Sequence, residues 1–284
     1  MRTETSTGDP LISAKVSVRY ADKPPVLHNV DLEVRRGEIL GLVGQSGSGK
    51  STLALAILGL LDAKRAQVEG SIEFQGCDLL QLSERELRAM RGRSLALVLQ
   101  SPLSSLNPAL RLRTQLREAW RAHASDAIPD CDREIQAALR SVSLPDDHEF
   151  LRKYASQISV GQAQRVLIAM AVLHRPALLI ADEATSALDV ITQAEILALF
   201  HALNRSTGMA ILYVSHDLAS VAGFCDRVSI LHQGRIVESA PTRKIFTNPQ
   251  HEYTRHLIAA MPQPPRRTEP CRPETLSREA AAGQ

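Results

Sequence analysis

The stretch GLVGQSGSGKST, residues 41–52, is the part of the sequence from which the expected fold follows. Its residues 44–51 fit the pattern G-x-x-x-x-G-K-[ST], which is typical of loops that bind phosphate. The mostly apolar run at 38–44 predicts a buried strand, and the apolar run from about 50 to 61 predicts a helix. The sequence therefore predicts a phosphate-binding loop at the junction between a strand and a helix.

Each residue type in this loop has a physical reason to be there. Gly44, Gly47 and Gly49 allow the backbone to curl without side chains, so that successive N–H groups point at one anion. The positive end of the helix dipole adds to the attraction. Lys50 supplies a charge for the outer phosphates, and Ser51 supplies a hydroxyl for Mg²⁺. A flexible Gly-Ser turn is the alternative interpretation, and the strand and helix on either side disfavour it.

A second stretch, LLIADEATSALDVITQ at 178–193, ends an expected buried strand in two adjacent acids, Asp182 and Glu183. Mg²⁺ prefers oxygen ligands and is often held by one or two carboxylates together with substrate phosphates. We therefore expect Asp182 to hold this ion through water, and Glu183 to orient and deprotonate an attacking water. Successive strand residues point to opposite sides, so the two acids can serve different partners if the chain turns directly after Asp182. A capping pair for a helix near Thr192 is the alternative, but Asp182 lies too far before it.

Strand and helix patterns along the 284 residues indicate one α/β domain interrupted by a helical block. An alternating segment at 13–34 predicts two antiparallel strands around a Pro-Pro turn. A helical pattern from about 112 to 173 separates two groups of strands. The other expected elements are strands at 70–80, 94–100, 177–181, 209–215 and 227–239 and a helix at 192–204.

Composition narrows the class of protein. The 33 basic and 31 acidic residues give a net charge of +2, whereas a general nucleic-acid binder would show a basic excess. The longest apolar run, 53–61, is far shorter than the roughly 20 residues of a membrane-spanning helix, so work at a membrane would depend on partners. The N-terminal residues show no signal peptide. No two cysteines have the C-x-x-C spacing of a zinc or redox site. We therefore expect reduced, unpaired thiols at Cys77, Cys131, Cys225 and Cys271.

From about 13 to 262 the chain resembles the ATPase subunit of an ATP-binding cassette (ABC) transporter. Separate motifs stand in the family's order, and the phosphate loop resembles the first of them, Walker A. The other residues that carry the resemblance are Tyr20 (the aromatic residue that stacks on adenine), Gln100 (Q-loop), 158–165 (signature motif, here ISVGQAQR), 177–183 (Walker B, here ALLIADE), 186–189 (D-loop, here SALD) and His216 (switch histidine).

The resemblance implies a role for each of these residues. Catalysis is expected of Glu183, His216 and Gln100, and Mg²⁺ is expected to be held by Ser51, Gln100 and Asp182. The expected nucleotide contacts are Tyr20, Gly44, Gln45, Ser46, Gly47, Ser48, Gly49, Lys50, Ser51 and Thr52. In this family the signature of one subunit completes the ATP site of the other, which adds Ser159, Gly161, Gln162 and Asp189.

The resemblance also implies an α/β fold: a P-loop NTPase core (RecA-like) with an antiparallel β subdomain and an inserted α-helical subdomain. The ABC ATPase domain is expected at 1–262, the helical insertion at about 101–175 and a disordered tail at 263–284. Expected partners are a second ABC ATPase subunit, identical or different, two transmembrane permease subunits and, indirectly, an extracytoplasmic solute-binding protein, but no nucleic acid. The implied cofactors are ATP and Mg²⁺, and the implied location is peripheral, at the cytoplasmic face of the inner membrane.

Two stretches point to a subfamily. QSPLSSLNP at 100–108 and the segment at 234–262 resemble ATPases of importers for peptides or nickel. Glu252 departs from the histidine-proline-tyrosine run usual there, and only Cys271 remains of a cysteine-rich tail common in peptide members. The expected function is to power import of peptides or of nickel and metal chelates. An ABC exporter ATPase and a soluble ABC ATPase acting on nucleic acid are the alternatives.

The signature departs from the family's usual Leu-Ser-Gly-Gly-Gln, because Val160 stands in place of the first glycine. A branched Cβ can crowd a γ-phosphate, and it restricts the backbone. We expect the chain's own site to be competent, and the partner's site to turn over slowly or only to bind. The alternative is that valine is accommodated with little effect. Ala184 likewise replaces a usual proline, and we expect it to be tolerated.

Overall fold

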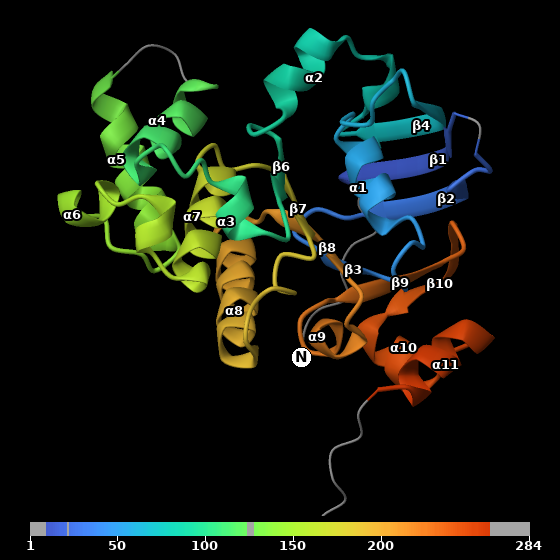
Figure 1. The fold of residues 1–284 in the computed structure, drawn as a ribbon. Coiled ribbons are helices and arrows are strands. Elements are labelled where there is room, and N and C mark those ends of the chain that lie inside the picture. The colour runs from blue at the N-terminus through green and yellow to red at the C-terminus, as the bar shows by residue number, and fades with distance from the viewer. Residues whose placement is uncertain (1–9, 22, 124–127, 262–284) are drawn as a thin grey trace, which may run out of the picture.

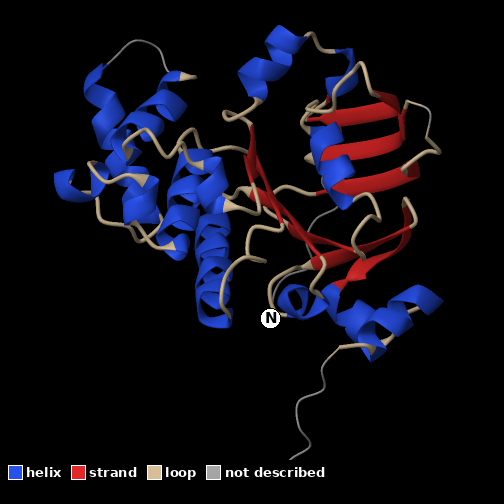
Figure 2. Cartoon of the chain, viewed as in Figure 1, coloured by secondary structure: helices blue, strands red, loops and turns tan. Residues whose placement is uncertain are grey.

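A computed structural model describes residues 10–21, 23–123 and 128–261. Figure 1 shows a small sheet that includes the strands nearest the N-terminus, a larger sheet through the middle of the molecule and a group of helices beyond the larger sheet. The helices flank the strands on several sides (Figure 2). The expected tail at 263–284 lies outside the described residues.

The small sheet is antiparallel and comes from the first part of the chain. It contains β1 (Ile12–Tyr20), β2 (Leu27–Val34), β4 (Ala66–Phe74) and β5 (Cys77–Asp78), in the order β2-β1-β4-β5. Alternate residues of β1 are buried, which is typical of a sheet with one covered face. The antiparallel strands predicted at 13–34 are confirmed.

The larger sheet has the order β10-β9-β3-β8-β7-β6. Its strands are β3 (Ile39–Val43), β6 (Leu95–Val98), β7 (Leu178–Asp182), β8 (Ala210–Ser215), β9 (Arg227–His232) and β10 (Arg235–Pro241). Neighbours are parallel except β10, which is antiparallel to β9. Every residue of β3 and β8 is buried, because both faces of this sheet are covered. The predicted α/β class is confirmed.

Helices connect the strands and fill the interval between β6 and β7. They are α1 (Lys50–Ile57), α2 (Glu84–Met90), α3 (Pro102–Ser105), α4 (Leu112–Arg121), α5 (Ile128–Ser141), α6 (His148–Leu151), α7 (Val160–Val172), α8 (Val190–Thr207), α9 (Leu218–Ala222), α10 (Thr242–Thr247) and α11 (Glu252–Ala259), with short 3₁₀ turns at Leu79–Gln81 and Ala155–Gln157. Helices α4 to α7 lie within 112–173, where the sequence predicts a helical pattern between two groups of strands.

Helix ends differ from the sequence expectation where capping residues intervene. Helix α1 ends at Ile57 rather than near 61, and Gly59 follows it with a left-handed φ of 60°. Helix α8 is longer than predicted at both ends. It begins after Asp189, whose side chain accepts bonds from the first turn, and it ends at Gly208 with φ 71°.

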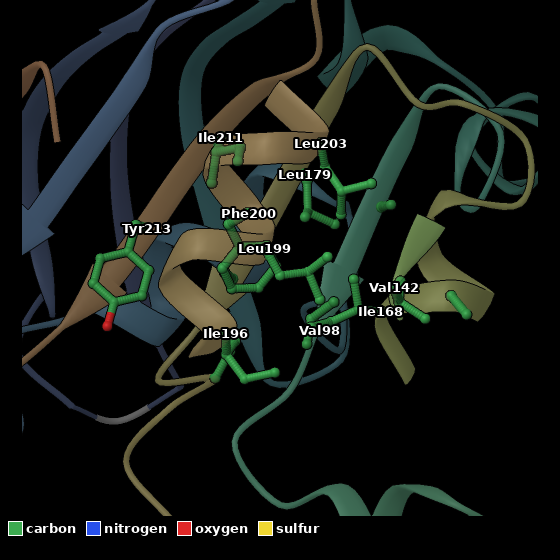
Figure 3. Packing of buried hydrophobic residues seen from close by; sticks show 14 of the residues in the cluster. Val98, Val142, Ile168, Leu179, Ile196, Leu199, Phe200, Leu203, Ile211 and Tyr213 are labelled. Carbon is green, nitrogen blue, oxygen red and sulfur yellow. The ribbon is translucent and has the colours of Figure 1, made fainter. Parts of the chain in front are cut away.

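Two hydrophobic cores lie on opposite faces of the larger sheet. Leu40 and Leu42 of β3 belong to the core that includes the small sheet and α1. Ile39 and Val43 belong to the core on the opposite face, which includes residues of α7 and α8. In that second core, side chains of α8 lie against the strands, as Figure 3 shows for Phe200. Packing on both faces fixes the sheet, and so fixes the positions of the strand ends.

Candidate functional site

Parallel pairing brings most of the predicted site residues to one edge of the larger sheet. Val43 lies opposite Ser215 on β8, and Asp182 lies opposite Val214. The phosphate loop therefore leaves β3 beside the end of β8, which His216 follows. Asp182 ends β7 on the other side of β8. The carboxyl ends of parallel strands are the usual place for a ligand in open α/β sheets.

The loop between β3 and α1 has the backbone that its glycines predict. Gly47 and Gly49 have φ of 79° and 106°, in the left-handed region. Gly49 caps α1 without any side-chain bond, so the N–H groups of the first turn can face an anion. Lys50 Nζ donates to the carbonyl oxygens of Gly44 at 2.8 Å and Gln45 at 3.0 Å. The loop thus holds its own lysine in place.

The ammonium group of Lys50 interacts electrostatically with two carboxylates, those of Glu183 and Asp182. Lys50 is only 5% exposed, and burial lowers the pKa of its amine, while Glu183 and Asp182 act in the opposite direction. The two acids therefore favour a buried ammonium, and the ammonium reduces the repulsion between them. This mutual stabilisation explains how two adjacent carboxylates persist at a strand end.

Asp182 has the properties of a magnesium ligand. Burial raises the pKa of its carboxyl group, the Ser51 hydroxyl opposes that rise, Glu183 adds to it and Lys50 opposes it. Its Oδ1 atom is buried and has no hydrogen-bond partner. Such an orphaned oxygen beside a serine hydroxyl fits the oxygen ligands that Mg²⁺ prefers. Within the described ranges no cluster of three or more His, Cys, Asp or Glu could hold a metal.

Glu183 leaves the strand in a different direction from Asp182. Its φ of 48° is left-handed, and its N–H donates to the Val214 carbonyl at 2.9 Å. The turn expected directly after Asp182 is therefore present. Glu183 Oε1 lies 3.2 Å from His216 Nδ1. A non-glycine residue held in this conformation is strained, and such strain is concentrated at functional sites. A carboxylate fixed next to an imidazole is suited to accept a proton.

Two predicted residues lie at the margins of this arrangement. Tyr20 ends β1 and is half-buried, and Gln100 follows β6 and is exposed. Gln100 is at the same sheet edge as the phosphate loop, because Val98 lies opposite Ala181. Among the described residues, no hydrogen bond or ion pair joins either side chain to the loop. Their contacts with nucleotide stay predictions.

The signature residues and Asp189 form a second group, where α7 and α8 begin. Ser159 caps α7: its hydroxyl accepts from the Gln162 N–H at 3.2 Å, and Gln162 Oε1 accepts from the Ser159 N–H at 3.1 Å. A Cβ on Gly161 would lie 2.9 Å from Cγ2 of Thr192, so the two helix starts are side by side. In the described part of the chain this group makes no hydrogen bond to the phosphate loop. Its expected contact with the nucleotide of a second subunit stays a prediction.

Val160 is the first residue of α7 and is 38% exposed. Val160 is accommodated in the first turn of the helix, whereas at Gly161 a Cβ would lie 2.9 Å from Cγ2 of Thr192. The exposed β-branched side chain of Val160 leaves less room for an anion that approaches the N–H groups at the start of α7. The slower turnover expected at the partner's ATP site stays a prediction.

We expect Val160→Gly to speed ATP turnover at the site that this signature completes, by roughly five- to ten-fold, because it removes steric crowding of about 1 kcal/mol. ATPase activity and vanadate trapping at each site of the assembled transporter measure this. Unchanged turnover and trapping at both sites would show that valine is accommodated.

We expect Asp182→Asn to weaken Mg²⁺-dependent ATP binding by about 10- to 100-fold, the usual loss for a residue that orients a bound ion. The same change should raise the melting temperature of the nucleotide-free protein, because partial burial disfavours the charged carboxyl group more than Ser51 and Lys50 favour it, as its raised pKa indicates. Isothermal titration and thermal unfolding give the two values. Asp31→Asn, at an exposed position on β2, is the control that should change neither. A melting temperature that falls would contradict the account of Asp182.

Sequence reasoning missed residues that touch the phosphate loop from the C-terminal part of the chain. The Gly234 N–H donates to the Ser48 carbonyl at 3.2 Å, and Tyr253 Oη accepts from the Gln45 N–H at 3.3 Å. The direct contact between Glu183 and His216 was also not predicted. The only sequence signal was the resemblance of 234–262 to importer ATPases, which said nothing about contacts.

A glycine loop between a parallel strand and a helix, with two acids at the end of β7, which lies on the other side of β8, defines a P-loop nucleotide-binding protein. Comparison with known families is more specific. The family described as "ABC transporter" matches residues 27–186, more than half of the chain, and the chain belongs to it. It is thus an ATP-binding ATPase of this family. The family described as "Oligopeptide/dipeptide transporter, C-terminal region" matches 237–283.

Curated relatives are similar over most of the chain. The chain is 41% identical to the oligopeptide transport ATP-binding protein OppD of Salmonella typhimurium, over 84% of this chain and 70% of that protein. It is 38% identical to the dipeptide transport ATP-binding protein DppD of Bacillus subtilis, over 86% and 73%. It is 43% identical to the peptidoglycan transport ATP-binding protein YejF of Agrobacterium fabrum, but spans only 48% of that protein's length.

Solved structures agree with the fold. The ATP-binding cassette MJ0796, in a dimeric post-hydrolysis state with ADP and Pi, superposes with a TM-score of 0.70 at 26% identity, covering 82% of this chain and 99% of that one. The CbiO1 subunit from Clostridium perfringens has a TM-score of 0.74 at 24% identity, covering 85% and 92%. This confirms the predicted P-loop NTPase fold. No helix in the described ranges combines the length and apolar character needed to cross a membrane.

Proposed function

We propose that this chain hydrolyses ATP to drive import of peptides. The observation that carries the proposal is the match of 237–283 to the C-terminal region of oligopeptide and dipeptide transporters. The similarity to OppD and DppD supports the same cargo class. Nickel or metal chelates, the other cargo suggested by the sequence, find no support among these relatives' names.

The site supports a division of tasks. Lys50 and the N–H groups of 47–52 would bind and orient the outer phosphates, which is most of what phosphoryl transfer requires. Glu183 would accept a proton from the attacking water, with His216 holding its carboxylate and facing the γ-phosphate. Asp182, Ser51 and Gln100 would hold Mg²⁺, which when bound supplies positive charge to the phosphates. Tyr20 would stack on the adenine.

Two chains would form the working unit. We propose an ATPase domain at 1–262 with a helical subdomain inserted at about 101–175. The signature group of Ser159, Gly161, Gln162 and Asp189 would complete the nucleotide site of a second ATPase subunit. Support comes from the dimeric cassette MJ0796, to which this chain is similar, and among the described residues no hydrogen bond joins this group to the chain's own phosphate loop. Closure of such a pair would exclude bulk solvent from the site while the attacking water stays in place.

The remaining partners follow from the importer class. We propose that the chain is bound peripherally at the cytoplasmic face of the inner membrane by two permease subunits, and that an extracytoplasmic solute-binding protein selects the cargo. The helical block and the segment after Gln100 would contact the permeases.

Uptake by a deletion strain tests the proposal. The strain would express this chain with the permease genes that neighbour it, and radiolabelled tripeptides and ⁶³Ni²⁺ would be offered separately. We expect peptide uptake that requires this chain and is lost with Glu183→Gln. Uptake of nickel alone would replace peptides by metal as the cargo. A chain that fractionates with nucleic acid, even when the permeases are present, would contradict an importer role.

A further inference from the structure

The C-terminal helix α11 reaches back to the phosphate loop. Tyr253, in its first turn, places its hydroxyl 3.3 Å from the Gln45 N–H, across 208 positions of sequence. Its ring stacks on His232 at the end of β9, with ring centroids 3.7 Å apart and an angle of 24° between the rings. The tyrosine therefore lies between the larger sheet and the loop, fixed on one side by stacking.

Helix α11 is itself fixed to the sheet. The Glu238 carboxylate on β10 accepts hydrogen bonds from the Gln250 N–H at 2.9 Å and the His251 N–H at 3.0 Å. His251 Nδ1 accepts from the Tyr253 N–H at 3.1 Å and caps the helix. These contacts determine where Tyr253 enters the site, so the phenol does not reach the loop by chance rotation of a free side chain.

One peptide unit joins Tyr253 to the lysine of the loop. The carbonyl of Gly44 and the N–H of Gln45 belong to the same planar peptide group and point in opposite directions. Lys50 Nζ binds that carbonyl at 2.8 Å, and Tyr253 Oη binds that N–H. The phenol and the ammonium thus hold the two ends of one rigid plane. Rotation of this plane would break both bonds.

We propose that Tyr253 is a positioning residue for the phosphate loop: it fixes the Gly44–Gln45 peptide so that Lys50 faces the phosphates before nucleotide arrives. The inference rests on the proposed ATP-binding function of the loop. Under this inference, helix α11 stabilises the phosphate loop at the nucleotide site, in addition to any contact that this region makes with another subunit. A loop that is already ordered loses less conformational entropy on binding, so affinity rises.

The test is Tyr253→Phe, which keeps the stacked ring and removes only the hydroxyl. We expect Mg-ATP binding, followed with a fluorescent ATP analogue and by titration with ATP, to weaken about two- to ten-fold, the usual effect of one hydrogen bond. KM should rise by the same factor with kcat unchanged, because the bond acts equally before and during the reaction. Tyr154→Phe, in the helical block, is the matched control and should bind ATP as the wild type does.

Three outcomes decide the inference. Wild-type affinity in Tyr253→Phe would overturn it. A fall in melting temperature that accompanies the weaker binding would also overturn it, because the effect would then be loss of structure rather than of loop order. Failure of the wild-type chain itself to bind Mg-ATP would contradict the proposed function of the site, and that result is distinguishable because it appears before any variant is made.

Discussion

Replacing Glu183 with Gln is expected to leave ATP binding intact and to slow hydrolysis by about 10²- to 10⁴-fold, the usual contribution of a general base. The amide has nearly the same shape as the carboxylate but cannot accept a proton from water. Glu183 is held for this task by its left-handed backbone and by His216 Nδ1, 3.2 Å from Oε1. Single-turnover hydrolysis and equilibrium binding of ATP separate the two effects.

The control for this substitution is Glu69→Gln, at an exposed position on β4 of the small sheet. It makes the same chemical change away from the sheet edge and should hydrolyse ATP at the wild-type rate. A Glu183→Gln variant with full activity would remove this residue from the role of base. Weakened binding in that variant would mean that the carboxylate contributes chiefly to the charge balance around Lys50.

Gly44→Ala is expected to have the second large effect, on both the loop and the fold. A Cβ at this position would lie 2.2 Å from the Leu231 carbonyl oxygen and 2.7 Å from Ser48 Oγ. The first of these atoms is backbone of a central strand and cannot move aside cheaply. We expect the free energy of unfolding to fall by about 3 kcal/mol. Hydrolysis should fall by about 10²-fold or more, because the loop that orients the phosphates must shift.

Gly223→Ala provides the comparison. That glycine follows α9 with φ of −96°, and a Cβ there would meet no atom within 4 Å. Chemical denaturation should therefore give nearly the wild-type free energy of unfolding for Gly223→Ala. Equal stability of the two variants would contradict the steric account of Gly44.

The candidate site consists of two incomplete halves. One half is the sheet edge with Lys50, Asp182, Glu183 and His216, and the other is the start of α7 with its signature residues. The chain's own fold places the members of each half together, but among the described residues no hydrogen bond or ion pair joins the two halves. Under the proposed function a partner subunit completes each half, so the expected asymmetry at Val160 is to be measured in the assembled transporter.

The sequence by itself determined the features that depend on neighbouring residues. The strand–loop–helix unit at 38–61 was predicted correctly in kind, because glycine spacing and apolar runs are local patterns. The placement of Asp182 at a strand end followed for the same reason. The order of the motifs was enough to identify the family, and with it the α/β class, before any contact was known.

Only the tertiary structure decided which distant residues meet. Burial of Lys50, the approach of His216 to Glu183 and the bond from Gln45 to Tyr253 all depend on strand order and on packing across both faces of the sheet. Residues 208 positions apart form that last bond. Sequence periodicity shows which face of an element is buried, but not which other element covers it. That choice is made by the collective packing of the cores, and it sets the geometry of the site.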